Sequence, residues 1–356
     1  MLLAVLVLEL VLKIHNPFDP RIKGDKIILP VNRTYNIEDV HTKEKILHKK
    51  NSLGFRGPEP TKNMKEKLTI IAVGGSTTEC FYLDDTKTWP FLLGNKLQKR
   101  FQGLWLNNAG LDGHSSFGHL VLMEDYIVKL KPKVVYFLVG INDMGIQELR
   151  TYDLANVKAG MNFSSPKRLF KSLAQHSEIM AIALNIVRYF KAKAMKLEYG
   201  IIDLDEVRSD KVSTAEKKLA LQENRQKFLA PYQVRLIKLV NICKENGITP
   251  ILITQPALWG NQIITTKNGK PMVIDLKNTR YAQDWAILEL YNNVTRKVGQ
   301  QENILVIDLA KKMPKKLEYY SDPFHFVPKG SKIVANIIAV SSYPYLRSRF
   351  PEYRIK

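Results

Sequence analysis

Five short apolar runs recur from residue 68 onward, each bounded by glycine, polar or turn-forming residues. They cover residues 68–73, 104–109, 134–139, 250–254 and 304–307. Continuous apolar runs of this length are typical of strands that are buried on both faces of a sheet. We therefore expect five buried strands.

Helical periodicity fills most of the intervals between these runs. The helical patterns cover residues 89–101, 118–130, 215–246 and 282–298. Strands that alternate with helices indicate βαβ units and a parallel sheet. The pattern predicts an α/β fold with three α/β/α layers around a flavodoxin-like, five-stranded parallel sheet.

One interval is longer than a minimal βαβ unit requires. Residues 146–232 separate the third and fourth expected strands, and residues 167–196 carry apolar side chains near helical spacing: Leu169, Phe170, Leu173, Ile179, Ile182, Ile186 and Phe190. We interpret this interval as a helical insertion. Either it packs on its neighbours, or it forms a lid over a site at the carboxyl end of the third strand.

The chain begins with an almost wholly apolar run over residues 1–12, followed by Lys13. The run is shorter than the about 20 residues of a membrane span, and it lacks the basic region and cleavage site of a secretory signal. A helix packed on the domain, an interfacial anchor and part of a longer span remain open. We favour a membrane anchor, and the basic residues that follow give weak evidence on orientation: Lys13, Arg21, Lys23 and Lys26.

Composition divides the chain into four parts. Residues 1–14 form the apolar segment, and residues 15–66, rich in Pro, Asn and Lys, form a lead-in that we expect to lie across the main domain. Residues 67–345 form the α/β domain, and residues 346–356 form a basic tail.

The charge balance is strongly basic, with 54 Lys and Arg against 34 Asp and Glu, a formal net charge of +20. Such a surplus favours anionic surfaces such as phospholipid head groups, acidic glycans or nucleic acid. The basic residues are scattered in short groups, and no zinc-finger, RNP-type or basic-zipper pattern accompanies them. We therefore expect no nucleic-acid partner and interpret the charge as a solvated basic surface.

Cysteine and histidine usage predicts neither a metal site nor a cofactor. Cys80 and Cys243 cannot make a disulfide framework or a Cys-rich metal site. We expect two buried thiols, although one bridge between them remains open. The seven histidines are dispersed and show no His-Glu-x-x-His spacing.

Polar residues gather in four groupings at positions where ligands commonly bind. In an open α/β sheet the ligand crevice lies outside the carboxyl ends of the strands. The groupings are residues 74–79, 108–115, 140–143 and 321–326. No grouping is strong evidence by itself. Residues 74–79 lack the lysine of a P-loop, residues 140–143 could be a turn, and residues 321–326 could be a cap with a structural histidine.

Together, the four groupings resemble the blocks of the SGNH, or GDSL-type, hydrolase superfamily, in the same order. Gly74-Gly75-Ser76 is similar to the nucleophile block, Gly113 to the glycine block, Asn142 to the Gly-x-Asn-Asp block, and Asp322-x-x-His325 to the last block. The resemblance covers roughly residues 68–342, apart from the insertion. One departure is Gly75, where the family more often has Asp.

The resemblance implies a serine hydrolase mechanism. Ser76 is the expected nucleophile, His325 its base, and Asp322 the group that holds the histidine tautomer. The backbone N–H groups of Ser76 and Gly113 and the side-chain amide of Asn142 are the expected oxyanion donors. We expect glycine at position 113 because a closely approaching amide leaves no room for a side chain.

Several other residues keep two interpretations. His114 and His119 are alternative bases, and Trp259 either lines the substrate pocket or belongs to the core. Asp84-Asp85 is interpreted as a helix cap. Lys267–Lys270 is interpreted as a hairpin tip.

The function that this resemblance implies is hydrolysis of a carboxylic ester through an acyl-enzyme on Ser76. The substrate would be a lipid, an acylated glycan or another small-molecule ester. Two alternatives remain: an O-acetyltransferase that modifies a cell-envelope polysaccharide, and a non-catalytic binding module. We expect association with a membrane or the cell envelope through residues 1–12, and otherwise a soluble protein.

Overall fold

The computed structural model describes residues 2–14, 22–23, 26–39, 43–146, 166–194 and 202–355. The chain divides into two compact units. One comprises Met1–Pro30 and Glu148–Tyr199, and the other comprises Val31–Gln147 and Gly200–Lys356.

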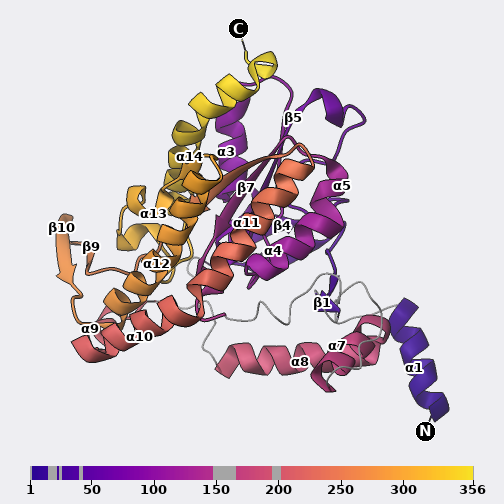
Figure 1. The fold of residues 1–356 in the computed structure, drawn as a ribbon, viewed down its shortest axis with the longest axis horizontal. Helices are drawn as coiled ribbons and strands as arrows, with labels where there is room; N and C mark the ends of the chain where they lie inside the picture. The colour runs from indigo at the N-terminus through magenta and orange to yellow at the C-terminus, as the bar shows by residue number, and fades with distance from the viewer. Residues whose placement is uncertain are drawn as a thin grey trace. The chain divides into compact units, whose positions relative to one another are not determined.

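A parallel sheet forms the centre of the second unit (Figure 1). Its five strands are β5 (Leu68–Gly74), β6 (Leu104–Asn108), β7 (Val134–Val139), β8 (Thr249–Thr254) and β11 (Val306–Ile307). Their spatial order is β6-β5-β7-β8-β11, which is the flavodoxin-like order. The predicted strands and the predicted three-layer α/β fold are confirmed.

Helices cover both faces of the sheet. The helix pair α3 (Trp89–Gln98) and α14 (Pro328–Arg349) packs on one face, and α4 (Ser116–Leu122), α11 (Leu229–Glu245) and α12 (Arg280–Gln301) lie on the other (Figure 1). Successive strand side chains alternate between the two faces. Every residue of β5, β7 and β8 is therefore buried.

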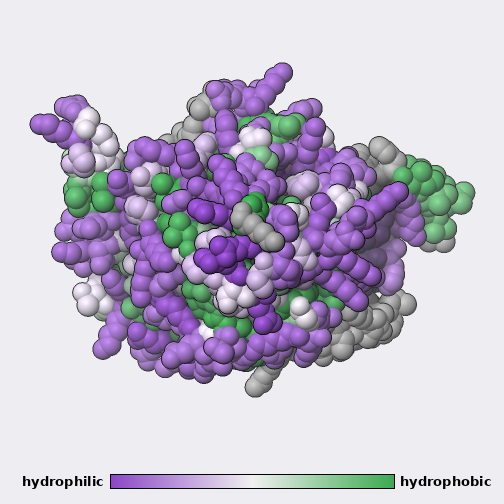
Figure 2. Space-filling view, turned by 90° about the horizontal axis from the view of Figure 1, so that it is seen from above, coloured by the Kyte–Doolittle hydropathy of each residue, from purple (hydrophilic) through white to green (hydrophobic). Residues whose placement is uncertain are grey.

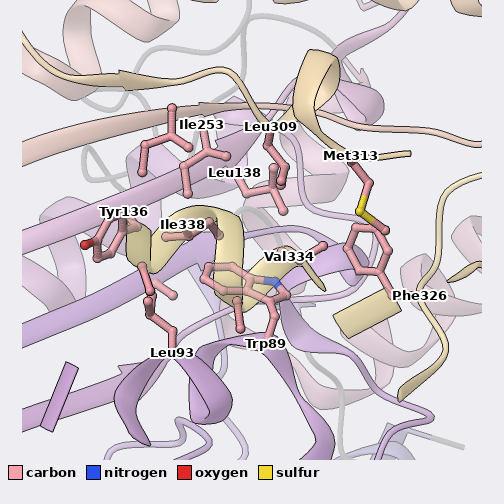
Figure 3. Close-up of a cluster of buried hydrophobic side chains, with 14 of the residues drawn as sticks. Trp89, Leu93, Tyr136, Leu138, Ile253, Leu309, Met313, Phe326, Val334 and Ile338 are labelled. Carbon is pink, nitrogen blue, oxygen red and sulfur yellow. The ribbon is translucent and has the colours of Figure 1, made fainter. Parts of the chain in front are cut away.

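The core between α3, α14 and the sheet reaches the loop that follows β5. Trp89 and Leu93 of α3 meet Tyr136 and Leu138 of β7 in this core (Figure 3). Trp89 is fully buried, and its indole N–H donates to the Thr77 carbonyl at 3.0 Å. The core thus holds the backbone of the nucleophile block directly.

Two helices differ from the expected pattern. Residues 215–246 form two helices, α10 (Thr214–Lys227) and α11, because Pro231 fits only the first turn of a helix. The expected helix over residues 118–130 begins at Ser116, and after α4 it continues through a π-turn (Met123–Ile127) into α5 (Val128–Leu130). A single π-turn of this kind inserts one residue into a helix without ending it.

The lead-in contains an antiparallel hairpin of β3 (Thr34–Glu38) and β4 (Lys45–Lys49). This hairpin belongs to the same unit as the sheet. The remaining helices and strands of that unit are α2 (Ser76–Glu79), α9 (Leu204–Ser209), α13 (Leu309–Lys312), β9 (Gln262–Lys267) and β10 (Lys270–Asp275). Its short 3-10 turns are Met64–Glu66, Asp85–Lys87, Ile141–Asp143, Leu317–Tyr319 and Pro351–Tyr353.

The hairpin tip predicted at Lys267–Lys270 joins β9 to β10. Its two central residues, Asn268 and Gly269, have φ of 50° and 74°. This left-handed pair is the geometry that Asn-Gly favours in two-residue hairpins.

The other unit contains α1 (Leu2–Ile14), α7 (Pro166–His176), α8 (Glu178–Ala194) and the strand pair β1 (Ile22–Lys23) and β2 (Lys26–Ile27). Glu9 of α1 accepts hydrogen bonds from the Ser177 hydroxyl and from the N–H groups of Glu178 and Ile179, at 2.9, 2.7 and 3.2 Å. Although burial opposes the effect, these bonds lower the pKa of Glu9. The one acidic side chain of α1 therefore caps α8.

Parts of two predictions fall outside the described residues. Residues 147–165 and 195–201 of the expected insertion, and Arg21 of the basic flank, are among them. The lid stays a prediction. No helix in the described part of the chain has both the length and the hydropathy to cross a membrane.

Both cysteines are buried and free, as expected, so the alternative of a bridge is wrong. Burial raises the pKa of each thiol to about 12. Cys80 and Cys243 are therefore thiols of the interior, protonated at neutral pH.

Candidate active site

Ser76 lies at the junction between β5 and the short helix α2. Gly75 is the residue before the helix, and Ser76 is its first residue. The first N–H groups of a helix have no acceptor within it, so they point outward with the positive end of the helix dipole. The Ser76 side chain thus sits where backbone donors gather, and only 5% of the residue is exposed.

A continuous hydrogen-bond path joins Ser76, His325 and Asp322. The Nε2 atom of His325 lies 2.7 Å from the Ser76 Oγ atom, and the Nδ1 atom lies 2.6 Å from the Asp322 Oδ2 atom. The second Asp322 oxygen accepts from the N–H groups of Phe324 and His325 at 3.0 and 2.9 Å. These bonds fix the carboxylate, which in turn orients the imidazole so that Nε2 can accept the serine proton.

Asn142 lies against the nucleophile loop at Gly75. Its Nδ2 atom donates to the His114 carbonyl at 3.0 Å. A Cβ atom at position 75 would lie 2.3 Å from that same Nδ2 atom. The absence of a side chain at Gly75 leaves room for this close approach of the Asn142 amide.

Gly113 occupies a loop that is tied to the nucleophile block. The adjacent Asp112 N–H donates to the Glu79 Oε2 atom at 2.6 Å, and the Leu111 N–H donates to the Gly74 carbonyl at 3.0 Å. A Cβ at position 113 would meet no protein atom within 4 Å, so the expected close approach, which concerns the substrate, stays a prediction. The structure shows a second reason for glycine here, a φ of +70°, which is a left-handed conformation that other residues adopt at a cost.

Arg56 of the lead-in supports the nucleophile block and escaped the sequence analysis. It is 4% exposed and donates to the carbonyls of Glu79, Cys80 and Leu83 at 2.8, 2.7 and 2.8 Å. The carbonyls at a helix end need such partners. No local sequence pattern marks Arg56, because its partners lie 23 to 27 residues further along the chain.

A second buried pair supports the loop that carries Asn142. Asp143 lies 3.0 Å from Arg235, and both side chains are 1% exposed. Asp143 also accepts from the Ser116 hydroxyl at 2.5 Å. Burial raises the pKa of Asp143, against the opposing effect of Arg235. Asp143 is thus a buried anchor of this loop as well as a turn residue.

Trp259 follows β8 and is half-buried beside the histidine loop. Its ring meets Phe324 edge-on at 5.7 Å, and Phe324 lies 4.5 Å from the His325 ring. Lys315 donates to the carbonyls of Ala257 and Trp259 and fixes this loop. Trp259 is therefore placed to border the histidine side of the site.

The alternative residues His114, His119 and Asp84 lie outside the path from Ser76 to Asp322. His119 is 1% exposed within α4, and His114 is half-buried with its carbonyl bound to Asn142. Asp84 caps the following 3-10 turn by accepting from the Thr86 N–H at 3.0 Å, as expected. Among the described residues, no three His, Cys, Asp or Glu side chains are grouped so that they could hold a metal ion.

Comparison with known proteins gives one family match. The model of the GDSL-like lipase/acylhydrolase family matches residues 72–333. This range includes all the residues of the Ser76, Gly113, Asn142 and Asp322–His325 blocks. A search of curated protein sequences gives no match.

Three similar solved structures share low sequence identity with the chain. LAE5, an alpha/beta hydrolase from the metagenome of Lake Arreo, Spain, is 15% identical, with 77% of this chain and 94% of that chain covered and a TM-score of 0.44. Axe2, an acetylxylan esterase from Geobacillus stearothermophilus, is 16% identical, with 76% and 92% covered and a TM-score of 0.43. A lipolytic protein of the G-D-S-L family from Desulfitobacterium hafniense is 13% identical, with 77% and 99% covered and a TM-score of 0.42.

Proposed function

The chain belongs to the GDSL-like lipase/acylhydrolase family, a family of carboxylic ester hydrolases, and we propose that it cleaves its ester through an acyl-enzyme on Ser76. The observation that carries this proposal is the path from Ser76 through His325 to Asp322, with distances of 2.7 and 2.6 Å. A serine hydroxyl becomes a useful nucleophile when such a base lies within hydrogen-bond reach.

The reaction follows from this path in two halves. The Ser76 Oγ atom attacks the ester carbonyl carbon while His325 Nε2 takes the hydroxyl proton. The tetrahedral intermediate then expels the alcohol, to which His325 returns the proton, and the acyl group stays on Ser76. Water, deprotonated by His325, repeats the attack and releases the carboxylic acid and free Ser76.

The negative charge of the tetrahedral intermediate needs donors that are already in place. We assign this role to the backbone N–H groups of Ser76 and Gly113 and to the Asn142 side-chain amide. That amide has two N–H groups, and the bond of one to the His114 carbonyl at 3.0 Å orients the other. Glycine at position 75 lets the amide approach the nucleophile closely.

We propose a lipid or acylated-glycan ester as the substrate, with Trp259 bordering the pocket. A panel of nitrophenyl esters from acetyl to long-chain acyl, with Ser76→Ala as the control, tests the chemistry and the acyl length together. Turnover of the panel by wild type alone supports the proposal, and equal turnover by both proteins contradicts it. Acyl transfer to a polysaccharide acceptor in place of hydrolysis would show that the protein is an O-acetyltransferase.

We also propose that α1 binds a lipid surface. Its apolar side chains are exposed over most of the helix, as the continuous green area in Figure 2 shows: Leu3, Val5, Leu6, Val7, Leu8, Leu10, Val11 and Ile14. The one acidic side chain of the helix, Glu9, is bound to the start of α8 and does not interrupt this surface. The net charge of +20 favours anionic head groups.

Flotation with phosphatidylglycerol vesicles tests this contact. We expect the wild-type protein to float with the vesicles and Leu6→Gln/Leu10→Gln to float at least tenfold less. Val273→Gln, which changes an exposed apolar residue of β10, is the matched control and should float like the wild type. Equal flotation of all three proteins would contradict the proposal.

A further inference from the structure

A buried ion pair joins the lead-in to the nucleophile block. The Lys50 Nζ atom lies 2.9 Å from the Glu79 Oε1 atom, and the two side chains are 1% and 2% exposed. Lys50 directly follows β4, and its N–H donates to the Arg33 carbonyl at 2.7 Å. Glu79 is the last residue of α2, the helix that begins at Ser76.

A pair this deeply buried calls for an explanation other than stability. Removing two charges from water costs several kcal/mol for each ion, and the attraction between them often fails to offset that cost. In buried ion pairs generally, replacement by apolar residues of similar volume is often neutral or stabilising. The pair therefore points to a requirement for a charged oxygen atom at this position.

The second oxygen atom of Glu79 shows where that requirement lies. Its Oε2 atom accepts the Asp112 N–H at 2.6 Å. Asp112 immediately precedes Gly113, and both residues are exposed, so neighbouring side chains do not enclose the loop. A charged acceptor holds a backbone N–H more strongly than a neutral one.

The lead-in segment that carries Lys50 is bound to the rest of the domain through Arg56. Arg56 bonds to the Glu79 carbonyl at 2.8 Å, and its Nε atom donates to Asp85 at 2.8 Å. The backbone of Arg56 also exchanges hydrogen bonds with Asn108, at the end of β6. Lys50 is thus presented to Glu79 from a segment that is itself bound to the end of α2 and to the end of β6.

We propose that Lys50 and Glu79 are positioning residues for the oxyanion hole: Lys50 fixes the Glu79 carboxylate, and the carboxylate fixes the Asp112–Gly113 backbone so that the Gly113 N–H faces the tetrahedral intermediate. This inference rests on the proposed function. Neither side chain touches the substrate, and both act through the loop.

Two double variants separate this role from a structural one. Lys50→Met/Glu79→Gln and Lys50→Met/Glu79→Met both remove the buried charges and keep similar volumes. Only the glutamine retains an oxygen acceptor for the Asp112 N–H. If the pair contributed only to stability, the two variants would have the same activity when both are equally folded.

We expect the methionine variant to have a kcat at least tenfold below that of the glutamine variant, with KM within about twofold, because an oxyanion donor acts mainly in the transition state. Hydrogen exchange at the Asp112 amide should be faster in the methionine variant than in the glutamine variant. Leu239→Ala, which opens a cavity at a fully buried position of α11, controls for loss of stability and should leave the exchange rate of the Asp112 amide unchanged.

Equal kcat and equal exchange rates in the two double variants would overturn the inference, even if the wild-type enzyme hydrolyses esters through Ser76. Absence of ester hydrolysis in the wild type would instead contradict the proposed function. The exchange experiment would then still report whether Glu79 holds the loop.

Discussion

The Asp322 carboxylate makes three hydrogen bonds, one with the His325 ring and two with the backbone N–H groups of Phe324 and His325 in its own loop. Asp322→Asn should keep this loop geometry, because the amide oxygen can still accept from the backbone. The amide cannot hold the imidazole in the working tautomer, so kcat should fall by about 10⁴, as in comparable triads. Steady-state kinetics checks this loss, and an unchanged near-ultraviolet circular dichroism spectrum would show that the fold is intact.

Gly75 provides a second test at the scale of one residue. Gly75→Asp restores the family's commoner residue but places a Cβ 2.3 Å from the Asn142 amide. We expect kcat to fall by about 10²-fold, the scale of an ångström misplacement in a catalytic site. Gly94→Ala in α3 is the matched control, since its Cβ would have an ordinary contact at 3.8 Å. Full activity of Gly75→Asp would contradict the assigned role of Asn142.

The sequence motifs were sufficient to nominate Ser76, Asp322 and His325, and the structure joins all three in one hydrogen-bond path. They could be nominated because the blocks that contain them resemble the ordered blocks of the GDSL-type family, and because these blocks lie at the ligand edge of the sheet. Arg56 and Glu79 could not be assigned in this way. Their partners are backbone groups 23 to 33 residues away, which no local pattern reveals.

At the scale of elements, α2 is too short to be stable by itself and depends on long-range donors. From one planar guanidinium, Arg56 donates to the carbonyl of Glu79 at the end of α2 and to the carbonyls of Cys80 and Leu83 just after it. Arg56→Lys keeps the charge but cannot reproduce that fork, so it should lower the free energy of unfolding by about 2 kcal/mol because buried carbonyls lose their donors.

Urea-induced unfolding measures this difference. Arg208→Lys, at an exposed ion pair of α9, is the control and should stay within about 0.5 kcal/mol of wild type. If the two variants unfolded at the same urea concentration, Arg56 would not be a support of α2.

Element prediction succeeded where burial was complete and failed where it was one-sided or interrupted. The strands of the main sheet are apolar throughout, so the sequence reveals them. In β4 the buried positions are Ile46 and His48, and a buried histidine breaks the apolar alternation. The division between α10 and α11 depends on Pro231, whose tolerance in a first turn allows a new helix to begin.

At the scale of the whole molecule, stability should depend on pH through two buried histidines. Burial lowers the pKa of His48 and of His119 from 6.5 to about 3. The unfolded chain therefore binds protons between pH 6.5 and 3 that the folded chain does not bind. Stability is fully present above pH 6.5 and is lost as the pH falls, by about 2 kcal/mol for each histidine between pH 7 and 5.

Thermal or urea unfolding at pH 7 and at pH 5 measures this loss. His119→Gln removes one of the two titrating groups, so its stability should fall less between these pH values than that of the wild type. An equal decrease in both proteins would show that His119 is not buried in its neutral form.

Turnover of a nitrophenyl ester by wild type and by Ser76→Ala, with both proteins shown to be folded, tests directly whether Ser76 is the nucleophile. We expect burst-phase acyl-enzyme formation by the wild-type protein, and a loss of about 10⁶ in kcat for the variant, as for nucleophile removal in comparable enzymes. Turnover by Ser76→Ala at the wild-type rate would contradict the assignment of Ser76 as the nucleophile.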